Sequence, residues 1–286
     1  ADPRPERLRV LERLALLEQE PARKVDALRN AGRLATALGE ADRTVAAWEA
    51  LLALTREDGE ALDGLVATLE REARYGALVS ALERRALLPS AHAEDVRRDR
   101  VQIARIARTQ LGDHERAIEE WRRIEEEIGA DDETTEELAT LLVATKRPEE
   151  LAALLAGAAS RAESPARRAE LLRRLGEVQA QELARPAEAV ESWAAALDAD
   201  PTEERAREGL RAALADGATR PRAVAVLTAV FVQQSEWRAA LELLEVRLDV
   251  APTTDARVAA LLEAAVWAEQ RCADVAFAYG CVERAF

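Results

Sequence analysis

The sequence predicts an all-α solenoid of short antiparallel helical hairpins, with about 16 helices in a single array over residues 1–286. Two observations support this fold class. The chain contains only 12 glycines and 10 prolines, and most of the other residues have high helix propensity. A tryptophan-centred segment also recurs at a nearly constant interval, and such recurrence is the sequence signature of a repeat protein.

The recurring segment is present in three clear copies, which are 38–48, 111–121 and 183–193. Each copy opens with Leu-Gly or Leu-Ala and ends on a tryptophan. The three tryptophans, Trp48, Trp121 and Trp193, are 73 and 72 residues apart. A fainter fourth copy ends at Phe286, with Val282 in the place of the tryptophan. Because the tryptophans share one position within apolar stripes, we predict that they are core residues.

A second series of similar segments alternates with the first, and its copies are 75–82, 148–155 and 237–244. Its first interval is 73 residues and its second is 89, and the step from Trp193 to Val282 is also 89. Both series therefore place one insertion, about half a hairpin long, within 197–237. An extra helix explains it, either around 203–214 or around 223–233.

Each predicted unit consists of a helix, a tight turn and a second helix. Gly39 and Gly112 are suited to the left-handed conformation that ends a helix, and Pro186 is suited to a first helical turn. Each helix has one apolar stripe that a lone hairpin cannot bury, so neighbouring hairpins must stack. The predicted units are 22–55, 58–88, 92–129, 132–162, 165–200, 202–250 with the extra helix, and 253–286.

One half-repeat resembles the tetratricopeptide repeat (TPR), and the matching residues are Leu175-Gly176, Ala189, Trp193, Ala196 and Pro201. It departs from the family pattern because Leu175-Gly176 lies one residue too far from Ala189. The other copies match less completely, with Ala117 and Trp121 in the second. The resemblance implies a right-handed superhelix whose first helices line a concave groove for a protein or peptide. By analogy with the family's concave positions, the groove residues are Arg173, Arg174, Glu177 and Gln181.

Charge and hydropathy exclude several classes of function. The formal net charge of −14 disfavours nucleic-acid binding, which needs a basic surface. The longest apolar stretch, 223–232, is far shorter than the roughly 18 residues of a membrane span. We expect a cytoplasmic protein, with a removed upstream secretion signal as the open alternative. The chain has no methionine and reaches Phe286 within an apolar stripe, so we expect a piece of a longer array.

No residue pattern predicts catalysis, a cofactor or a metal. Cys272 and Cys281 form no metal-ligand spacing, and we expect them to be small core residues. His92 and His114 lie near predicted helix starts among charged residues, so we expect them at the surface. Gly-rich phosphate loops and nucleophile motifs are absent from the sequence.

These observations favour a non-catalytic adaptor that binds a protein or peptide, and the acidity favours a basic partner. Two alternatives stay open. One is a structural spacer or self-assembling array, which concentration-dependent assembly would indicate. The other is a regulatory or docking arm of a larger enzyme, which a neighbouring catalytic domain would indicate.

The core assignment of the tryptophans predicts the effect of Trp121→Ala. Removing a buried indole leaves a cavity, so we expect the free energy of unfolding to fall by about 3–5 kcal/mol. Urea unfolding of the variant and the wild type measures this difference. Unchanged stability together with lost partner capture would instead assign Trp121 to the binding surface.

Overall fold

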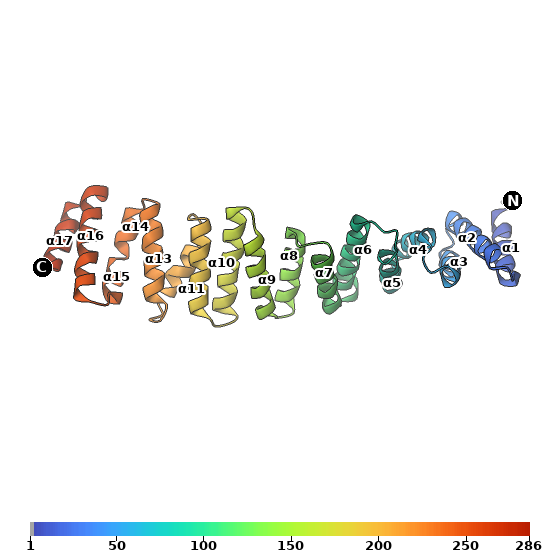
Figure 1. Cartoon of the computed structure of the whole chain (residues 1–286), viewed down its shortest axis with the longest axis horizontal. Coiled ribbons are helices and arrows are strands. Elements are labelled where there is room, and N and C mark those ends of the chain that lie inside the picture. Colours follow the sequence, from blue (N-terminus) through green and yellow to red (C-terminus); the bar gives the residue numbers. More distant parts are fainter. Residues whose placement is uncertain (1–2) are drawn as a thin grey trace. The chain divides into compact units, whose positions relative to one another are not determined.

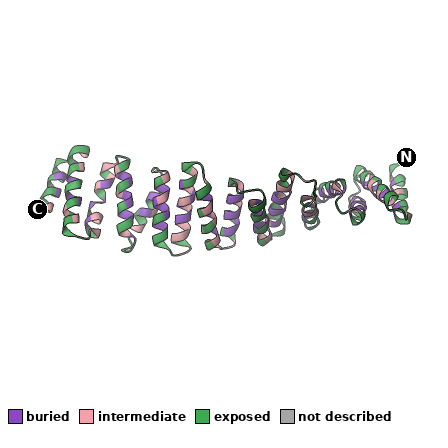
Figure 2. Ribbon diagram, viewed as in Figure 1, coloured by how far each residue is buried: buried purple, intermediate pink, exposed green. Residues whose placement is uncertain are grey.

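The computed structural model describes residues 3–286, which form 17 α-helices, one short π-helix and no strand (Figure 1). The predicted all-α array of consecutive helices is confirmed. The chain divides into two compact units, residues 1–141 and 142–286, with α8 running across the division. Buried residues in each helix lie on the sides that face neighbouring helices (Figure 2).

The elements of residues 1–141 follow one another in the order of the sequence. They are α1 (Arg4–Leu17), α2 (Pro21–Leu38), α3 (Ala41–Leu54), α4 (Gly59–Arg71), α5 (Tyr75–Ala86), α6 (Ala93–Ile106), the π-helix η1 (Ala107–Leu111), α7 (His114–Glu127) and the start of α8 (Asp132–Ala144). From α1 to α7, successive helices pack against each other. Their shared core contains Trp48 and the buried leucines of α3, α4 and α5.

Residues 142–286 continue with the same kind of helix pair. After the end of α8 come α9 (Pro148–Arg161), α10 (Pro165–Gln181), α11 (Pro186–Ala199), α12 (Glu204–Ala213), α13 (Arg220–Gln233), α14 (Trp237–Glu242), α15 (Leu244–Val250), α16 (Thr254–Cys272) and α17 (Val275–Ala285). Trp193, Leu210 and Phe231 belong to the principal core cluster of this unit.

Within residues 3–286, seven turns between paired helices contain one residue in the left-handed conformation, with φ between 52° and 73°. These residues are Gly39, Ala73, Gly112, Lys146, Ala184, Ser235 and Ala273. Gly39 and Gly112 confirm the sequence-based prediction. The other five have side chains and accept a conformation that costs an L-residue about 1–2 kcal/mol. The seven residues give a register in which positions of different hairpins can be compared.

The seven turns are of two kinds. In the narrow kind, the backbone N–H after the left-handed residue donates to the carbonyl five residues earlier, as Glu40 does to Ala35 at 3.1 Å. In the wide kind it donates to the carbonyl six residues earlier, as Arg185 does to Gln179 at 2.7 Å. The extra residue of the wide turn explains why Leu175-Gly176 is one residue too far from Ala189.

Two of the repeated tryptophans, Trp48 and Trp193, are each held between two glycines. Trp48 of α3 lies against Gly32 of α2 and Gly64 of α4, and a Cβ at Gly32 would lie 2.6 Å from Trp48 Cε2. Trp193 of α11 lies in the same way between Gly176 of α10 and Gly209 of α12. Only 2% of Trp48 and 6% of Trp193 is exposed, and Trp121 is 1% exposed. The predicted core role of these three tryptophans is confirmed.

The insertion within 197–237 contains both helices that the sequence offered as alternatives. The left-handed residue Ser235 follows α13, so α13 pairs with α14–α15 and α12 is the additional helix. α12 packs its Gly209 on Trp193, as the first helix α4 packs Gly64 on Trp48. The array therefore contains two successive first helices at this point, and α14–α15 is a single second helix broken at Leu243.

The contact between Gly209 and Trp193 predicts opposite effects for two glycine substitutions. In Gly209→Ala, the added Cβ would lie 2.6 Å from Trp193 Cε2, and overpacking should lower stability by about 1–3 kcal/mol. In Gly157→Ala, the nearest atom is 3.4 Å away on the flexible Arg161 side chain, so helix propensity should raise stability by about 0.5–1 kcal/mol.

Urea unfolding followed by circular dichroism compares the two variants with the wild type. Equal effects of the two substitutions would contradict the close approach of α12 to Trp193.

Candidate functional site: a groove on α4, α5, α6 and α8

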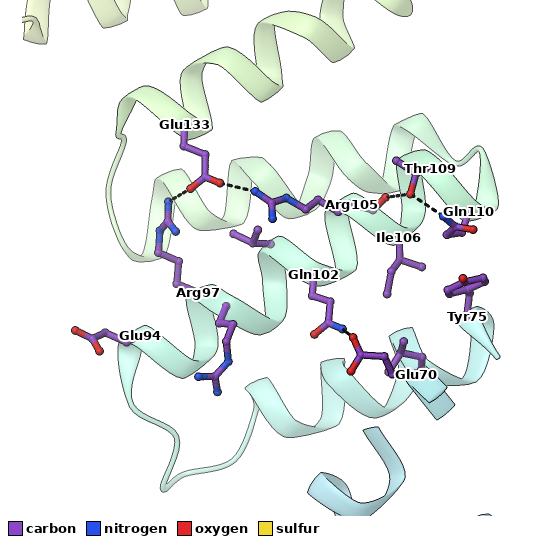
Figure 3. Close-up of a pocket in the computed structure, with 13 residues that line it drawn as sticks. Glu70, Tyr75, Glu94, Arg97, Gln102, Arg105, Ile106, Thr109, Gln110 and Glu133 are labelled. Carbon is purple, nitrogen blue, oxygen red and sulfur yellow. Dashed lines mark hydrogen bonds and ion pairs between the residues drawn. The ribbon is translucent and has the colours of Figure 1, made fainter. Parts of the chain in front are cut away.

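A groove of about 720 Å³ lies on one side of the hairpins in residues 1–141 (Figure 3). We call it groove 1. Its wall consists mainly of the first helices α4, α6 and α8, together with η1 and the start of α5. The lining residues are Glu70, Tyr75, Leu78, Glu94, Arg97, Arg98, Val101, Gln102, Arg105, Ile106, Thr109, Gln110 and Glu133.

The floor of groove 1 is apolar. Leu78, Val101 and Ile106 are buried, and Tyr75 is half-buried at the first position of α5. Tyr75 takes this place because it follows the left-handed turn at Ala73, which directs α5 back along α4. Figure 3 shows Tyr75 and Ile106 on the same side of the groove. An apolar floor of this kind can accept an apolar side chain from a ligand.

The arginines of groove 1 are held by carboxylates of the chain itself. Arg97 donates to Asp131 at 2.6 Å. Figure 3 shows the bonds that Arg97 and Arg105 donate to Glu133, at 2.7 and 2.8 Å. Arg98 pairs with Asp95 at 2.7 Å. The pairs of Arg97 and Arg105 link α6 to the start of α8, and all of these ion pairs together neutralise the basic wall.

Two carboxylates that line groove 1 are not neutralised in the way that its arginines are. Glu70 accepts a hydrogen bond from Gln102 Nε2 at 2.9 Å, and Glu94 is exposed at the start of α6. Within residues 3–286, neither Glu70 nor Glu94 has an arginine or lysine partner. The charge that groove 1 offers to a ligand is therefore negative.

A wide turn presents the polar end of groove 1. The backbone after Ile106 forms the π-helix η1, and Asp113 N–H donates to the carbonyl of Ala107 at 2.8 Å. Thr109 and Gln110 are exposed on η1 and line the groove. Single π-helical turns within α-helices are frequent at functional sites.

The N-terminus of α8 is fixed by Asp131, whose environment controls its protonation. Burial alone would raise the pKa of the Asp131 carboxyl. The backbone N–H of Thr134, at 2.8 Å, and the Arg97 guanidinium outweigh burial and lower this pKa below its ordinary value. Hydrogen bonding to Glu133 and Asp131 in turn raises the pKa of Arg97. The carboxylate and guanidinium therefore remain charged together.

A second groove, of about 690 Å³, lies in residues 142–286, and we call it groove 2. Its lining residues are Leu142, Val143, Lys146, Arg147, Pro148, Leu151, Leu155, Arg174, Glu177, Val178, Gln181 and Glu182. Counted from the left-handed residues, Val178 matches Ile106 and Pro148 matches Tyr75. The two units thus carry a groove at the same register position.

The predicted groove residues have two different environments. Arg174, Glu177 and Gln181 line groove 2 together. Arg173 is only 7% exposed and pairs with Glu177 at 2.6 Å. It does not line groove 2. The lining of groove 1 was missed from the sequence, although counting from the predicted turn at Gly112 could have found it.

The cysteines and histidines lie outside both grooves. Cys281 is buried and Cys272 half-buried, and both are free thiols. Burial raises the pKa of the Cys281 thiol, which lowers its reactivity. His92 is exposed before α6 and His114 is half-buried at the start of α7.

Residues 3–286 contain neither a cluster of metal-binding side chains nor a helix suited to span a membrane. No group of three or more His, Cys, Asp and Glu side chains in this range is arranged to hold a metal ion. None of the helices in it combines the length and the apolar character that crossing a membrane requires.

No protein-family model matches the chain, and comparison with curated protein sequences gives no match. Solved structures match this chain, but they superpose on it only in part. YrrB, a TPR protein with an unusual peptide-binding site, is 16% identical and covers 65% of this chain and 91% of its own, with a TM-score of 0.35.

Two other matches cover more of the chain. The C-terminal part of a TPR repeat-containing protein from Cytophaga hutchinsonii is 11% identical over 90% of this chain and 94% of its own, with a TM-score of 0.37. The TPR2AB domain of yeast Sti1, in a pHSP90 complex, is 17% identical over 91% and 98%, with a TM-score of 0.34. All three are TPR proteins, the family that the sequence pattern resembles.

The lowered pKa of Asp131 predicts how Asp131→Asn changes stability with pH. When the pKa of a carboxyl is lower in the folded state than in the unfolded state, its charge stabilises the fold. This stabilisation is fully present at pH values above the unfolded-state pKa, which is near 4 for aspartate. That stabilisation is lost as pH falls through the folded value. Because the ion pair with Arg97 is partly exposed, the variant should be less stable than the wild type by up to about 1 kcal/mol at pH 7.

Urea unfolding at pH 7 and at pH 3 measures both proteins. The difference between them should shrink at pH 3, and asparagine should keep the helix cap at both pH values. A difference that is as large at pH 3 as at pH 7 would show that the Asp131 charge does not stabilise α8.

Proposed function

We propose that this chain is a non-catalytic scaffold that binds an extended segment of a partner protein in groove 1. The observation that carries the proposal is the recurrence of an open groove at one register position in both compact units. A repeat array provides such positions without dedicated loops, because each hairpin places the same helix faces beside its neighbours.

The lining of groove 1 supports a peptide ligand in particular. The apolar floor offers burial for one or two side chains, while Gln102, Thr109 and Gln110 offer hydrogen-bonding groups for a peptide backbone. The walls are held by ion pairs between helices, so little conformational entropy is lost when a ligand binds. Groove 1 is therefore preorganised for binding.

The proposal predicts that filling groove 1 removes partner capture. Thr109 is exposed in the groove, and its hydroxyl bonds the carbonyl four residues earlier at 2.8 Å. Thr109→Arg should place a long side chain across the floor and reduce capture by about tenfold or more, as expected for loss of a central contact worth at least about 1.4 kcal/mol. The measurement is pull-down from a lysate of the native source, with quantitative mass spectrometry.

Thr140→Arg is the matched control. Thr140 is also exposed and bonds the carbonyl four residues earlier at 2.8 Å, but it does not line groove 1. A partner that is lost with Thr109→Arg and kept with Thr140→Arg supports the proposal. A partner that both variants retain, or recovery of the chain alone, contradicts it.

A further inference from the structure

A third copy of the groove position exists in the chain, and the chain's own aromatic side chains fill it. Trp267 is the sixth residue before the left-handed Ala273, as Ile106 is before Gly112. Trp237 is the second residue after the left-handed Ser235, as Tyr75 is after Ala73. The register positions of Tyr75 and Ile106 in groove 1 are therefore both occupied by tryptophan in α14 and α16.

The two tryptophans pack against each other and are covered by arginines. Their ring centroids are 6.1 Å apart at an interplanar angle of 49°. The Arg271 guanidinium lies 5.2 Å from the Trp237 ring centroid, and that of Arg247 lies 5.1 Å from the Trp267 centroid. Arg247 also pairs with Glu263, which is at the register position of Gln102 in groove 1. The two arginine–ring distances lie within the range of cation–π attraction.

Groove 1 has a counterpart of one of the two aromatic rings of the third copy and lacks the other ring. Tyr75 supplies an aromatic ring in the place of Trp237, but Ile106 replaces the large indole of Trp267 and Gln110 replaces Arg271. The space beside Tyr75 is therefore open, and Figure 3 shows Tyr75 and Ile106 beside it. Glu70 and Glu94 add negative charge without a basic partner in the described residues.

We infer that groove 1 binds a peptide segment in which a large aromatic residue is adjacent to an arginine or lysine. The ligand's ring packs on Tyr75 and Ile106, in the place that the Trp267 ring takes in the third copy. The ligand's cation binds Glu70 or lies over the aromatic pair, as Arg247 and Arg271 do. This inference rests on the proposed function and specifies the ligand of the same groove.

Groove 2 provides an internal contrast. Pro148 replaces Tyr75 and offers no aromatic face to a ligand's ring or cation. A basic aromatic segment should therefore bind groove 1 in preference to groove 2.

The test uses the intact chain and three fluorescently labelled hexapeptides with glycine at the four outer positions. Their central pairs are Trp-Arg, Ala-Arg and Trp-Glu, and binding is measured by fluorescence anisotropy. We expect the Trp-Arg peptide to bind about tenfold or more tightly than either of the others. Equal affinity for the Ala-Arg peptide overturns the inference.

Variants that exchange the register residues locate the binding. Ile106→Trp should fill groove 1 as Trp267 fills the third copy, and Trp-Arg peptide affinity should fall about tenfold or more. Unchanged affinity in Ile106→Trp overturns the inference, provided that circular dichroism shows the wild-type helix content.

Tyr75→Ala serves if Ile106→Trp does not fold, because Tyr75 is half-buried at a helix start. It should reduce Trp-Arg affinity by a similar factor, and unchanged affinity contradicts the inference. The inference fails while the proposed function stands if the pull-down captures a partner that needs groove 1 and if peptides from that partner bind groove 1 without an aromatic residue. Both proposals fail if no captured partner depends on groove 1.

Discussion

The close contact of a tryptophan with glycines on both neighbouring first helices sets how closely the helices pack around Trp48 and Trp193. At Trp48 and Trp193 the indole fills the space that a Cβ on either side would take. The helices approach so closely that Nε1 of both indoles is buried without a hydrogen-bond partner. Leaving such a donor unpaired costs about 1–3 kcal/mol, which the burial of two large aromatic side chains offsets.

Much of this packing could be predicted from the sequence, because it depends on large and small residues at regular spacing. The interval between the tryptophans indicates the repeat, and the change of interval from 73 to 89 residues places an insertion within 197–237. Which of two helices is the additional one could not be predicted from the interval. The conformation of Ala73, Lys146 and Ser235 could not be predicted from residue type. Their left-handed conformation is imposed by the pairing of helices on both sides and contradicts local preference. The seven repeat units drawn from the sequence stay a prediction.

The candidate site was less predictable, because it depends on a turn that is one residue longer and on which charged side chains are paired with each other. By analogy with the family, Arg173, Arg174, Glu177 and Gln181 should all line one groove. In the structure Arg173 is buried and paired with Glu177, so it does not line groove 2 with the other three. Equally, Arg97 and Arg105 would suggest a basic groove from the sequence. Their bonds to Glu133 leave the carboxylates of Glu70 and Glu94 as the charges that are not paired with arginine or lysine in the described chain.

The additional helix α12 is comparable to a stacking fault in a layered crystal. Two layers of the same type, α12 and α13, follow each other, and the alternation resumes with α14–α15 and α16–α17. Arg207 and Arg211 of α12 lie over the Phe231 ring of α13, at 5.6 and 5.7 Å, and join the two layers. The array therefore accommodates a single added helix without losing the alternation on either side of it.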